Sequence, residues 1–564
     1  MSKSEELHEI TLDVRGMTCD NCAMHVTKAL YLVPGVKDVD VPGWQSAQAT
    51  IKAGDGVSNE ALISAIEGAG YRASVKQRRE LSPVTPKGND DAPEFDLMVI
   101  GGGSAGFAAA IKGAELGKRV VLVEAGTIGG TCVNVGCVPS KTLIRAAELH
   151  HRSGHHPFDG VTRITSSGNW SAVVAQKDEL VSRLRRTKYV DVLAAYPAIT
   201  YIQGWARLLG DNRVEITPVD NGAAPSIYTP GNIIIATGAS AWAPPIPGLA
   251  EAGYLTSTTA LELAERPASM IVVGANAVGL ELAQVYARFG TRVTVLEVMP
   301  MITPFEEPEI SEALAGYLRE EGLAIETGVN ITRVDKDARG YRLTVERDGE
   351  KQVFEAEALL MATGRRANTD GMGLKEAGVK LGKRGEIVVD DHLRTANPYV
   401  YAAGDVTGRD MFVYVAAYSG TLAAENALNG EGRVYDTRVL PRVTFTDPAV
   451  ASVGLTERQA EDEGYAVNTS VLRLEHVPRA LANRDTRGLI KLVADAMTNR
   501  LLGAHVLAPD GGEVVQVAVI ALKAGMTVQD LTETFFPYLT MVEGIKLAAQ
   551  AFEKDVAMLS CCAG

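Results

Sequence analysis

The first part of the chain alternates between short strand-like runs and longer helix-like runs of apolar residues. In order, the runs cover residues 10–14, 22–32, 36–41, 47–51 and 59–68, with a last short stretch from Tyr71. The helix-like runs stand second and fifth, so the pattern predicts the order βαββαβ. We therefore expect residues 1–75 to form one small ferredoxin-like domain.

A polar stretch then separates this domain from the rest of the chain. Residues 76–91 contain few apolar side chains and two prolines. That composition is typical of a tether. We expect a flexible linker over residues 76–94 and a small domain that moves independently.

A different pattern follows the linker, in which a short apolar strand leads into a glycine-rich turn and a helix. The strand covers residues 96–100, the turn Gly101–Gly106 and the helix residues 107–116, and the next strand over residues 120–123 ends at Glu124. The N-terminus of such a helix can face a pyrophosphate, and the acid can bind ribose hydroxyls. The pattern predicts a dinucleotide-binding domain.

The same pattern recurs later in the chain. Residues 270–273 are the strand, 274–279 the turn and 280–289 the helix, and the following strand ends at Glu297. Asn276 stands where the middle glycine of the turn is expected, so the backbone would approach a pyrophosphate differently. The fold class is therefore α/β, with two Rossmann-like domains.

Length and charge narrow the possibilities. The chain has 564 residues, an apolar fraction of 46%, and 55 Lys and Arg against 69 Asp and Glu, for a net charge of −14. This balance favours neither nucleic acid nor an anionic membrane as a partner. The N-terminus lacks the apolar core of a secretory signal, and no apolar run approaches the ~20 residues of a membrane span. We expect a soluble cytoplasmic protein without membrane insertion.

Six cysteines form three pairs, which are Cys19 with Cys22, Cys132 with Cys137, and Cys561 with Cys562. In the reducing cytoplasm, cysteines more often serve redox chemistry or metal binding than structural disulfides. The pairing predicts a process in which electrons or a metal ion pass between thiols.

The first pair lies where a strand meets a helix. Two thiols at a helix N-terminus face one way, and the helix dipole lowers their pKa, which favours thiolates that bind a soft cation. A redox-active Cys-x-x-Cys is the alternative. The sequence Gly16-Met17-Thr18-Cys19-Asp20-Asn21-Cys22, together with the βαββαβ order, resembles the heavy-metal-associated domain of copper chaperones and metal-pumping ATPases.

The second pair stands in the sequence Gly-Gly-Thr-Cys-Val-Asn-Val-Gly-Cys-Val-Pro-Ser-Lys, residues 129–141. This motif resembles the redox-active motif of the FAD-dependent pyridine nucleotide-disulfide oxidoreductases, which include glutathione reductase, lipoamide dehydrogenase and mercuric reductase. The resemblance implies that Cys137 is the thiol next to the flavin, that Cys132 is the exchanging thiol, and that Lys141 lies near the flavin ring.

Further residues match the cofactor-binding positions of this family. The resemblance implies FAD contacts at Gly101, Gly103, Ser104, Ala105, Gly106, Glu124, Gly130, Thr131, Lys141, Thr237, Gly238, Gly404 and Asp405, and NAD(P)H contacts at Gly274, Gly279, Glu281 and Glu297. Glu281 matches the acidic residue that the family holds near the nicotinamide and Lys141.

The choice between NADH and NADPH stays open. A carboxylate at Glu297 accepts hydrogen bonds from a free 2′-hydroxyl and repels a 2′-phosphate, which favours NADH. Mercuric reductases usually take NADPH, however, and Arg288 or Arg292 are candidates to accommodate the phosphate.

The C-terminal part, from about Tyr435, resembles the dimerisation domain of the family, an α+β domain. Disulfide-cleaving members carry there a histidine that protonates the departing thiol at the partner's active site, whereas this chain has Tyr538, followed by Thr540 and Glu543. A phenol with a pKa near ~10 does not suit that step. Reducing a thiolate-bound metal ion needs no such proton, so the substitution favours a metal substrate.

The last pair, Cys561 and Cys562, supports the same conclusion. Adjacent Cα atoms lie ~3.8 Å apart, less than the ~4.4 to ~6.8 Å usual for a disulfide. Two such thiols suit capture and release of a soft ion. Thioredoxin reductases of high molecular weight also end in redox cysteines, but they keep the histidine motif. The whole chain resembles mercuric reductases.

This resemblance implies that Hg(II) passes from Cys19 and Cys22 to Cys561 and Cys562 of the partner subunit, and then to the buried pair. There, electrons from NAD(P)H by way of FAD reduce it to Hg(0). The implied partners are thiol complexes of Hg(II), NAD(P)H, a second copy in a homodimer, and a mercury transporter that hands over the metal.

Three interpretations stay open. Tyr538 and Tyr189 match tyrosines that the family holds near the metal, but packing is the plain alternative for both. The histidines at 150, 151, 155 and 156 suggest a metal site, although a solvated loop is favoured. A protein that carries metal without reducing it is the rival function, which the intact motif of Cys132 and Cys137 opposes.

The expected domains are a heavy-metal-associated domain over 1–75, a linker over 76–94, an FAD-binding domain over 95–240 and 366–434, an NAD(P)H-binding domain over 241–365, and a dimerisation domain over 435–564.

Overall fold

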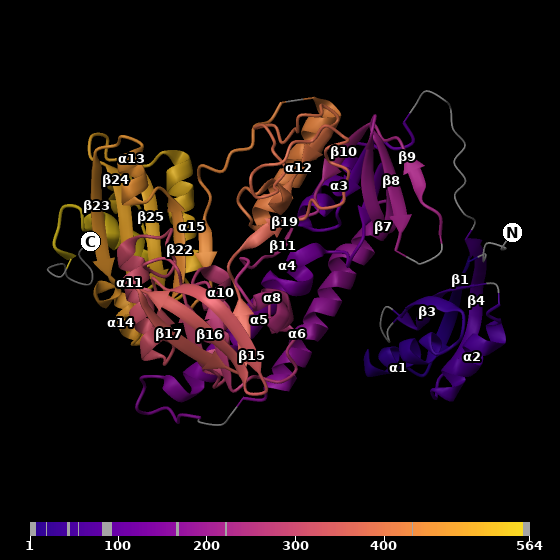
Figure 1. Cartoon of the computed structure of the whole chain (residues 1–564), viewed down its shortest axis with the longest axis horizontal. Helices are drawn as coiled ribbons and strands as arrows, with labels where there is room; N and C mark the ends of the chain where they lie inside the picture. Colours follow the sequence, from indigo (N-terminus) through magenta and orange to yellow (C-terminus); the bar gives the residue numbers. More distant parts are fainter. Residues whose placement is uncertain are drawn as a thin grey trace. The chain divides into compact units, whose positions relative to one another are not determined.

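The computed structural model describes residues 7–17, 20–41, 46–54, 56–81, 93–164, 168–219, 223–430 and 432–556. The chain divides into two compact units, Met1–Ala92 and Pro93–Gly564, called the small and the large unit below (Figure 1).

The small unit is a four-stranded antiparallel sheet with two helices. Its elements are β1 (Leu7–Arg15), α1 (Asp20–Tyr31), β2 (Val36–Asp40), β3 (Gln48–Gly54), α2 (Asn59–Gly68) and β4 (Arg72–Leu81). The strands lie in the order β2-β3-β1-β4. Ile10, Leu12 and Ile51 on the strands and Leu62 and Ile66 on α2 are fully buried. The predicted βαββαβ order is confirmed.

The boundary expected after residue 75 is wrong. Strand β4 continues to Leu81, and its last residues pair with β1 up to the partners Leu7 and Leu81. Hydrogen bonding to a central strand overrides the low apolar content that indicated a linker from residue 76. Residues 82–92 of the expected linker lie outside the described residues.

The first dinucleotide fold of the large unit is a seven-stranded sheet in the order β20-β10-β5-β6-β7-β8-β9. Its elements are β5 (Leu97–Ile100), α3 (Ser104–Glu115), β6 (Val120–Glu124), β7 (Ile199–Gly210), β8 (Arg213–Pro218), β9 (Ser226–Tyr228), β10 (Asn232–Ile235), β20 (Val400–Ala402) and α12 (Val413–Asn429). The strands from β20 to β7 are parallel. Helices α3 and α12 pack against each other (Figure 1). A Cβ at Gly420 would stand 2.0 Å from the carbonyl oxygen of Ala105, so only glycine allows this approach.

Between β6 and β7 the chain forms a group of helices. These are α4 (Gly130–Val135), α5 (Cys137–His155), α6 (Trp170–Arg185), the π-helix η2 (Arg186–Val190) and α7 (Asp191–Ala194).

The second dinucleotide fold contains the four-stranded parallel sheet β14-β13-β12-β18. Its elements are β12 (Ser269–Val273), α10 (Ala277–Arg288), β13 (Arg292–Leu296), α11 (Pro308–Glu320), β14 (Ala324–Glu326) and β18 (Ala358–Met361). An antiparallel sheet of β15 (Asn330–Asp337), β16 (Gly340–Arg347) and β17 (Glu350–Ala356) adjoins it, and β11 (Ala239–Ala241) pairs with β19 (Arg365–Ala367). Both predicted Rossmann-like folds are confirmed.

The C-terminal part is α+β, as expected. Its antiparallel sheet has the order β21-β22-β25-β24-β23. The strands are β21 (Arg442–Thr444), β22 (Ala449–Gly454), β23 (Val467–Arg473), β24 (Leu489–Asp495) and β25 (Leu501–Ala508), and the main helices are α15 (Gly511–Ala524), α16 (Val528–Glu533) and α17 (Glu543–Gln550). The shorter helices of the large unit are α8 (Leu249–Ala252), α9 (Ser257–Leu261), η3 (Gly404–Thr407), α13 (Glu457–Asp462), η4 (Leu474–His476) and α14 (Pro478–Asn483).

A buried ion cluster connects the second dinucleotide fold to the C-terminal part. The Nζ atom of Lys491, on β24, lies 2.9 Å from both Glu307 and Glu309 and 2.7 Å from Glu457. The Lys491 side chain is 2% exposed. Because an unpaired charge is costly to bury, the cluster holds α11 firmly against the sheet.

A second cluster makes a similar connection through α10. Arg288 lies 2.7 Å from Glu321 and 2.9 Å from Asp447, and Arg487 also contacts both carboxylates. Arg288 and Glu321 belong to the second dinucleotide fold, whereas Asp447 and Arg487 belong to the C-terminal part. The two folds are thus joined at two charged contacts.

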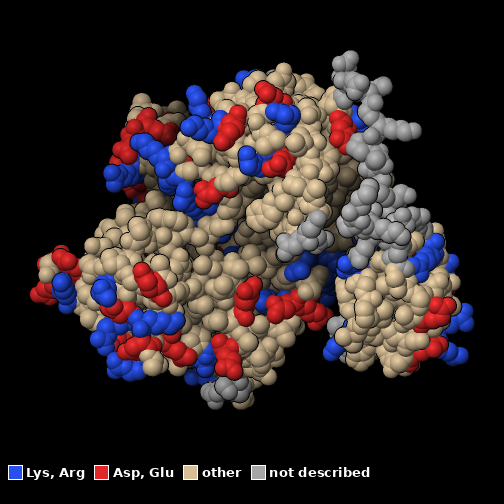
Figure 2. Space-filling view, turned by 45° about the vertical axis from the view of Figure 1, so that its right-hand side comes forward, with Lys and Arg blue, Asp and Glu red and all other residues tan. Residues whose placement is uncertain are grey.

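Basic and acidic side chains are interspersed over the face of the large unit drawn in Figure 2. Among the residues that the structure describes, no helix is both long enough and apolar enough to cross a membrane.

Candidate active site

The central thiol pair lies where α4 ends and α5 begins. Cys132 is on α4, and Cys137 is the first residue of α5. Gly136 lies between the helices, where a Cβ would stand 2.9 Å from the carbonyl oxygen of Thr131. This sharp connection brings the two thiols within hydrogen-bonding distance, and both are free.

Their hydrogen bond makes the two thiols unequal. The Cys132 thiol donates to Cys137 and, with the charge of Lys141, lowers the pKa of Cys137 to about 7 although burial opposes this shift. The same hydrogen bond, together with burial, raises the pKa of Cys132. Cys137 is therefore the thiol of the pair that ionises near neutral pH.

Lys141 is held one helical turn beyond Cys137. Its Nζ donates to Glu281 Oε2 at 2.7 Å and lies 4.6 Å from the centre of the Phe445 ring. Glu281, on α10, is 5% exposed, and its other oxygen accepts from the Phe445 backbone N–H at 2.8 Å. The structure thus brings Lys141 and Glu281 together, as expected, and adds Phe445, which no sequence motif marks.

Tyr189 lies beside the thiols. The pKa of the Tyr189 phenol is raised, chiefly by burial and in addition by the charges of Cys132 and Cys137. A hydrogen bond with Ser104 opposes this shift. The ring packs edge-on against Phe107, with centroids 4.8 Å apart. Tyr189 belongs to the π-helix η2, a type of turn found often at functional sites.

A hydrogen bond ties the last residue of α6, directly before this π-helix, to α4. The Arg185 Nε donates to Asn134 Oδ1 at 2.7 Å, and the Asn134 Nδ2 donates to the carbonyl oxygens of Ile128 and Gly130 at 2.9 Å. Asn134 stands between the two cysteines in the sequence, and this position alone would have marked it as a candidate.

Several residues expected to bind FAD lie close together just beyond the carboxyl ends of β5, β6 and β20. Gly103 and Gly130 approach so closely that a Cβ on Gly130 would stand 2.6 Å from the Gly103 Cα, and a Cβ on Gly404 would stand 2.9 Å from the Ala105 side chain. Glu124 accepts from the backbone N–H groups of Gly102 and Gly126, both at 2.6 Å.

The remaining expected FAD positions lie on neighbouring segments. Gly101 has φ +109° and Gly238 φ +69°, so both turns favour glycine. The Thr237 hydroxyl donates to the Asn368 carbonyl oxygen at 2.7 Å. Burial raises the pKa of Asp405, and the charge of Arg365 opposes that shift.

Arg365 is a second site residue that no sequence motif marks. Its Nη2 donates to Thr131 Oγ1 at 3.4 Å and to the Ala239 carbonyl oxygen, and its Nε lies 3.7 Å from Asp405 Oδ2. That Nε is buried without a hydrogen-bond partner. An unsatisfied donor beside Thr131 and Asp405 fits a phosphate-bearing dinucleotide such as FAD.

The turn of the second dinucleotide fold accommodates Asn276 without strain. Gly274 has φ +103°, and a Cβ on Gly279 would stand 1.9 Å from the Gly274 carbonyl oxygen. Asn276 has φ −108° and is the N-cap of α10, where its Oδ1 accepts from the Ala277 backbone N–H at 3.0 Å. The third glycine is therefore obligatory, and the middle one is not.

Arg288 is unsuitable as a phosphate ligand, contrary to the expectation. Its side chain is 3% exposed and paired with Glu321 and Asp447. It ends α10, whose 12 residues separate it from the glycine turn. Arg292 begins β13, at the opposite end of the strand from Glu297.

The outer thiol pairs are only partly described. Cys22 is half-buried at the start of α1, and Cys19, Cys561 and Cys562 lie outside the described residues. Tyr538 precedes α17 and is 50% exposed. Glu543 accepts from the Leu539 backbone N–H at 3.2 Å, which holds this turn together.

The histidine group forms no metal cluster in the described part of the chain. Three of its members belong to α5 rather than to the expected loop. His150 stacks on Phe289, and His151 stacks on His155 with centroids 4.3 Å apart. Burial lowers the pKa of His151 to about 4, so this group stays neutral.

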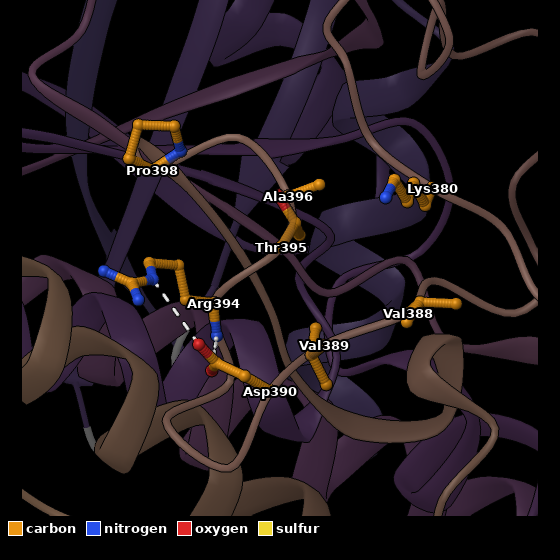
Figure 3. Close-up of a pocket in the computed structure, with 8 residues that line it drawn as sticks. All are labelled: Lys380, Val388, Val389, Asp390, Arg394, Thr395, Ala396 and Pro398. Atoms are coloured by element: carbon orange, nitrogen blue, oxygen red, sulfur yellow. Dashed lines mark hydrogen bonds and ion pairs between the residues drawn. The ribbon is translucent and has the colours of Figure 1, made fainter.

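A separate surface cavity of about 580 Å³ contains none of the predicted site residues (Figure 3). An ion pair at 3.4 Å between Arg394 and Asp390 lies on its wall. It is lined by Lys380, Val388, Val389, Asp390, Arg394, Thr395, Ala396 and Pro398.

Comparison with known families finds three matches. Residues 95–420 match the pyridine nucleotide-disulphide oxidoreductases, residues 440–549 the dimerisation domain of that family, and residues 11–72 the heavy-metal-associated domain.

Similar proteins cover the whole chain. A mercuric reductase of Staphylococcus aureus is 44% identical over 98% of this chain and 99% of its own length. A mercuric reductase of Bacillus cereus is 44% identical over 100% of this chain and 88% of its own length. One of Streptomyces lividans is 49% identical over 83% of this chain and 98% of its own length. Among solved structures, the HOCl-induced flavoprotein disulfide reductase RclA from Escherichia coli, in its Cu(II) complex, matches with a TM-score of 0.72, 30% identity, and coverage of 81% of this chain and 99% of its own.

Proposed function

The chain belongs to the pyridine nucleotide-disulphide oxidoreductases and, within them, to the mercuric reductases, and from this we propose that it reduces thiol-bound Hg(II) to Hg(0) with electrons from NAD(P)H. The net reaction is NAD(P)H + Hg(II) → NAD(P)⁺ + H⁺ + Hg(0). The observation that carries the proposal is the unequal thiol pair, in which Cys137 has a pKa of about 7 beside Lys141.

This pair suits both steps that the reaction needs. Thiolate sulfur is the ligand that a soft ion such as Hg(II) prefers, and two thiols side by side hold it from two directions. FAD, when bound, supplies a two-electron carrier between the nicotinamide and the site of the thiols. Lys141, fixed by Glu281, keeps a positive charge beside Cys137 and so favours its thiolate form.

We propose that Arg365, Asp405 and the glycine turn at Gly101–Gly106 hold the FAD phosphates and ribityl chain. The buried, unsatisfied Nε of Arg365 supports this assignment. Glu124 would bind the adenosine ribose, and Gly130, Thr131 and Thr237 would contact the flavin side.

Tyr538 supports a metal substrate over a disulfide. A departing thiolate needs a proton from an acid that titrates near neutral pH, and a phenol is too weak an acid for that step. His505 cannot replace it, because its side chain is 3% exposed and its Nε2 contacts the Leu455 carbonyl oxygen at 3.0 Å.

We propose that the three thiol pairs form a relay. Cys19 and Cys22 receive Hg(II) from a thiol complex or a transporter, Cys561 and Cys562 of the partner subunit pass it inward, and Cys132 and Cys137 hold it for reduction. One thiolate replaces another at each step, so no free ion forms and no electrons move until the last site. Tyr189 and Tyr538 are proposed to contact the ion on its way.

The dimerisation domain indicates a homodimer. Phe535 is 98% exposed, and Tyr538 and Leu539 beside it are 50% and 41% exposed, an apolar surface that suits burial against a second copy. A reducing cytoplasm, which keeps the thiols available, is the proposed location.

The test is oxidation of NAD(P)H by the purified flavoprotein with Hg(II) in excess thiol, compared with oxidised glutathione and lipoamide. We expect turnover with Hg(II) and release of mercury vapour, and little turnover with either disulfide. A Cys137→Ser variant should lose the mercury reaction. Rapid turnover of glutathione disulfide without turnover of Hg(II) would refute the proposal.

A further inference from the structure

Glu297 occupies a fixed position at the coenzyme end of the second dinucleotide fold. Its Oε2 accepts from the Ala275 backbone N–H at 2.7 Å, and its Oε1 accepts from the Met299 backbone N–H at 2.9 Å. The side chain is 8% exposed. Both oxygens are anchored, so the carboxylate cannot rotate away from the turn to make room for another anion.

The same arrangement stands in the first dinucleotide fold. Glu124 is the last residue of β6, and Glu297 directly follows β13. The two carboxylate oxygens of Glu124 accept from the backbone N–H groups of Gly102, in the glycine turn, and of Gly126, two residues after Glu124. The adenosine ribose of FAD carries a free 2′-hydroxyl and never a phosphate. The second fold thus repeats an acid–turn geometry that in the first fold serves an unphosphorylated ribose.

The sequence around Glu297 offers no nearby cation. After Arg292, which begins β13, the next basic residue in the chain is Arg319. Arg292 stands at the other end of the five-residue strand, roughly 16 Å away. Arg288 is buried in its pairs with Glu321 and Asp447.

Two arginines reach the neighbouring strand β14, and one of them, Arg319, donates from its Nη2 to the Ile325 carbonyl oxygen at 3.2 Å. Arg347 Nη2 lies 2.5 Å from Glu326 Oε2, and Glu326 pairs with Leu296, the residue before Glu297. The charge of Arg347 is therefore matched by Glu326. Glu297, by contrast, accepts from two backbone N–H groups and forms no ion pair among the described residues.

We propose that the chain is an NADH-dependent enzyme in which Glu297 accepts hydrogen bonds from the adenosine ribose and excludes the 2′-phosphate of NADPH. The inference rests on the proposed function only in so far as that function uses a reduced nicotinamide dinucleotide. It assigns NADH where the family resemblance alone favours NADPH. Repulsion between like charges about 5 Å apart near a protein surface corresponds to on the order of 100-fold in affinity.

Equilibrium binding tests the proposal without turnover. Titration calorimetry of the oxidised, FAD-loaded full-length protein with NAD⁺ and with NADP⁺ should give a dissociation constant for NADP⁺ at least ~100-fold higher. With ferricyanide as the acceptor and without mercury, the kcat/KM for NADH should correspondingly be higher than that for NADPH.

Two variants locate the discrimination. Glu297→Gln removes the charge and should reduce the NAD⁺ preference by roughly tenfold or more. Val298→Arg leaves the Glu297 hydrogen bonds in place, and because Val298 is 66% exposed, the new cation can reach a 2′-phosphate and should tighten NADP⁺ binding. Glu320→Gln, which neutralises an exposed carboxylate on α11, is the matched control and should leave the ratio unchanged.

Flavin absorbance and the melting temperature check that each variant is folded; if Glu297→Gln is not, Val298→Arg decides. Equal affinity of the wild type for the two coenzymes would overturn the inference, as would an unchanged ratio in the folded variants. Reduction of Hg(II) with equal use of both coenzymes would overturn this inference alone. A strict NADH preference without reduction of Hg(II) would instead overturn the proposed function alone.

Discussion

The Cys137 thiol is the residue on which the chemistry depends most. An ordinary thiol with a pKa near 9 is protonated at neutral pH, whereas Cys137, with a pKa of about 7, is a thiolate in about half of the molecules at pH 7. The hydrogen bond from Cys132 contributes most to this shift, and the charge of Lys141 adds to it. The reactive thiolate fraction therefore rises as the pH increases through 7.

Replacing Lys141 by Met should move this titration. Without the cation, the pKa of Cys137 rises, and the midpoint of its pH-dependent alkylation by iodoacetamide in the reduced enzyme shifts upward from about 7. Lys383→Met, which removes an exposed lysine, should leave the midpoint in place. An identical midpoint in Lys141→Met would mean that Lys141 does not act on Cys137.

The residues of the site were predictable to different degrees. Glycines, cysteines and the strand-end acids follow from local spacing, because each one serves its own turn or helix. Arg365 and Phe445 were missed since their contacts join segments more than a hundred residues apart, and no local pattern marks them. Arg288 was misjudged for a similar reason, as only the fold shows that the end of α10 faces Asp447.

At the level of elements, α10 has two distinct ends. Its N-terminus forms the coenzyme turn with Asn276, and its last residue, Arg288, reaches Asp447 in the C-terminal part. Burial alone would raise the pKa of Asp447, but the charges of Arg288, Arg487 and Arg152 outweigh it and lower that pKa. The charged pair stabilises the folded enzyme above the ordinary carboxyl pKa, and this contribution is lost as the pH falls through the lowered value.

Asp447→Asn should therefore destabilise the large unit. Leaving Arg288 with one carboxylate fewer in a buried position should lower the free energy of unfolding by about 3 kcal/mol at pH 7. Urea or thermal unfolding followed by flavin fluorescence measures the loss, and wild type and variant should converge in acid. Asp462→Asn breaks an ion pair whose side chains are 90% and 73% exposed and should change little. Equal losses in both variants would contradict the expectation.

The elements themselves were largely predictable from the sequence. Strands β5 and β12 are short apolar runs followed by glycine turns, so periodicity and turn chemistry agree. The π-helix around Tyr189 was not predictable, because it depends on packing against Phe107 and on the hydrogen bond from Arg185 to Asn134. The end of β4 was misplaced because polar residues can complete a sheet whose core is filled by other strands.

At the level of the whole molecule, the small unit has a hydrophobic core of its own. A protein lacking residues 1–92 should therefore fold, bind FAD and dimerise, and it should reduce small mercury–thiol complexes. Flavin content, size-exclusion chromatography and mercury-dependent NADH oxidation check this. Loss of flavin from the truncated protein would show that the two units depend on each other.

The C-terminal pair should matter for delivery of the ion rather than for the supply of electrons. Replacing Cys561 and Cys562 by Ala should slow turnover of thiol-complexed Hg(II) on the order of tenfold or more, because the relay loses one exchange step. NADH oxidation with ferricyanide should continue. Undiminished mercury turnover would remove the tail from the relay.

The ion clusters of Lys491 and of Arg288 have a consequence for how the molecule responds to its coenzyme. Each one joins the second dinucleotide fold to the C-terminal sheet through charges that are costly to separate. Hinge closure around the nucleotide is therefore not expected, and the radius of gyration in small-angle scattering should stay constant on addition of NAD⁺. Crystals grown without the coenzyme should accept it by soaking and keep their lattice intact.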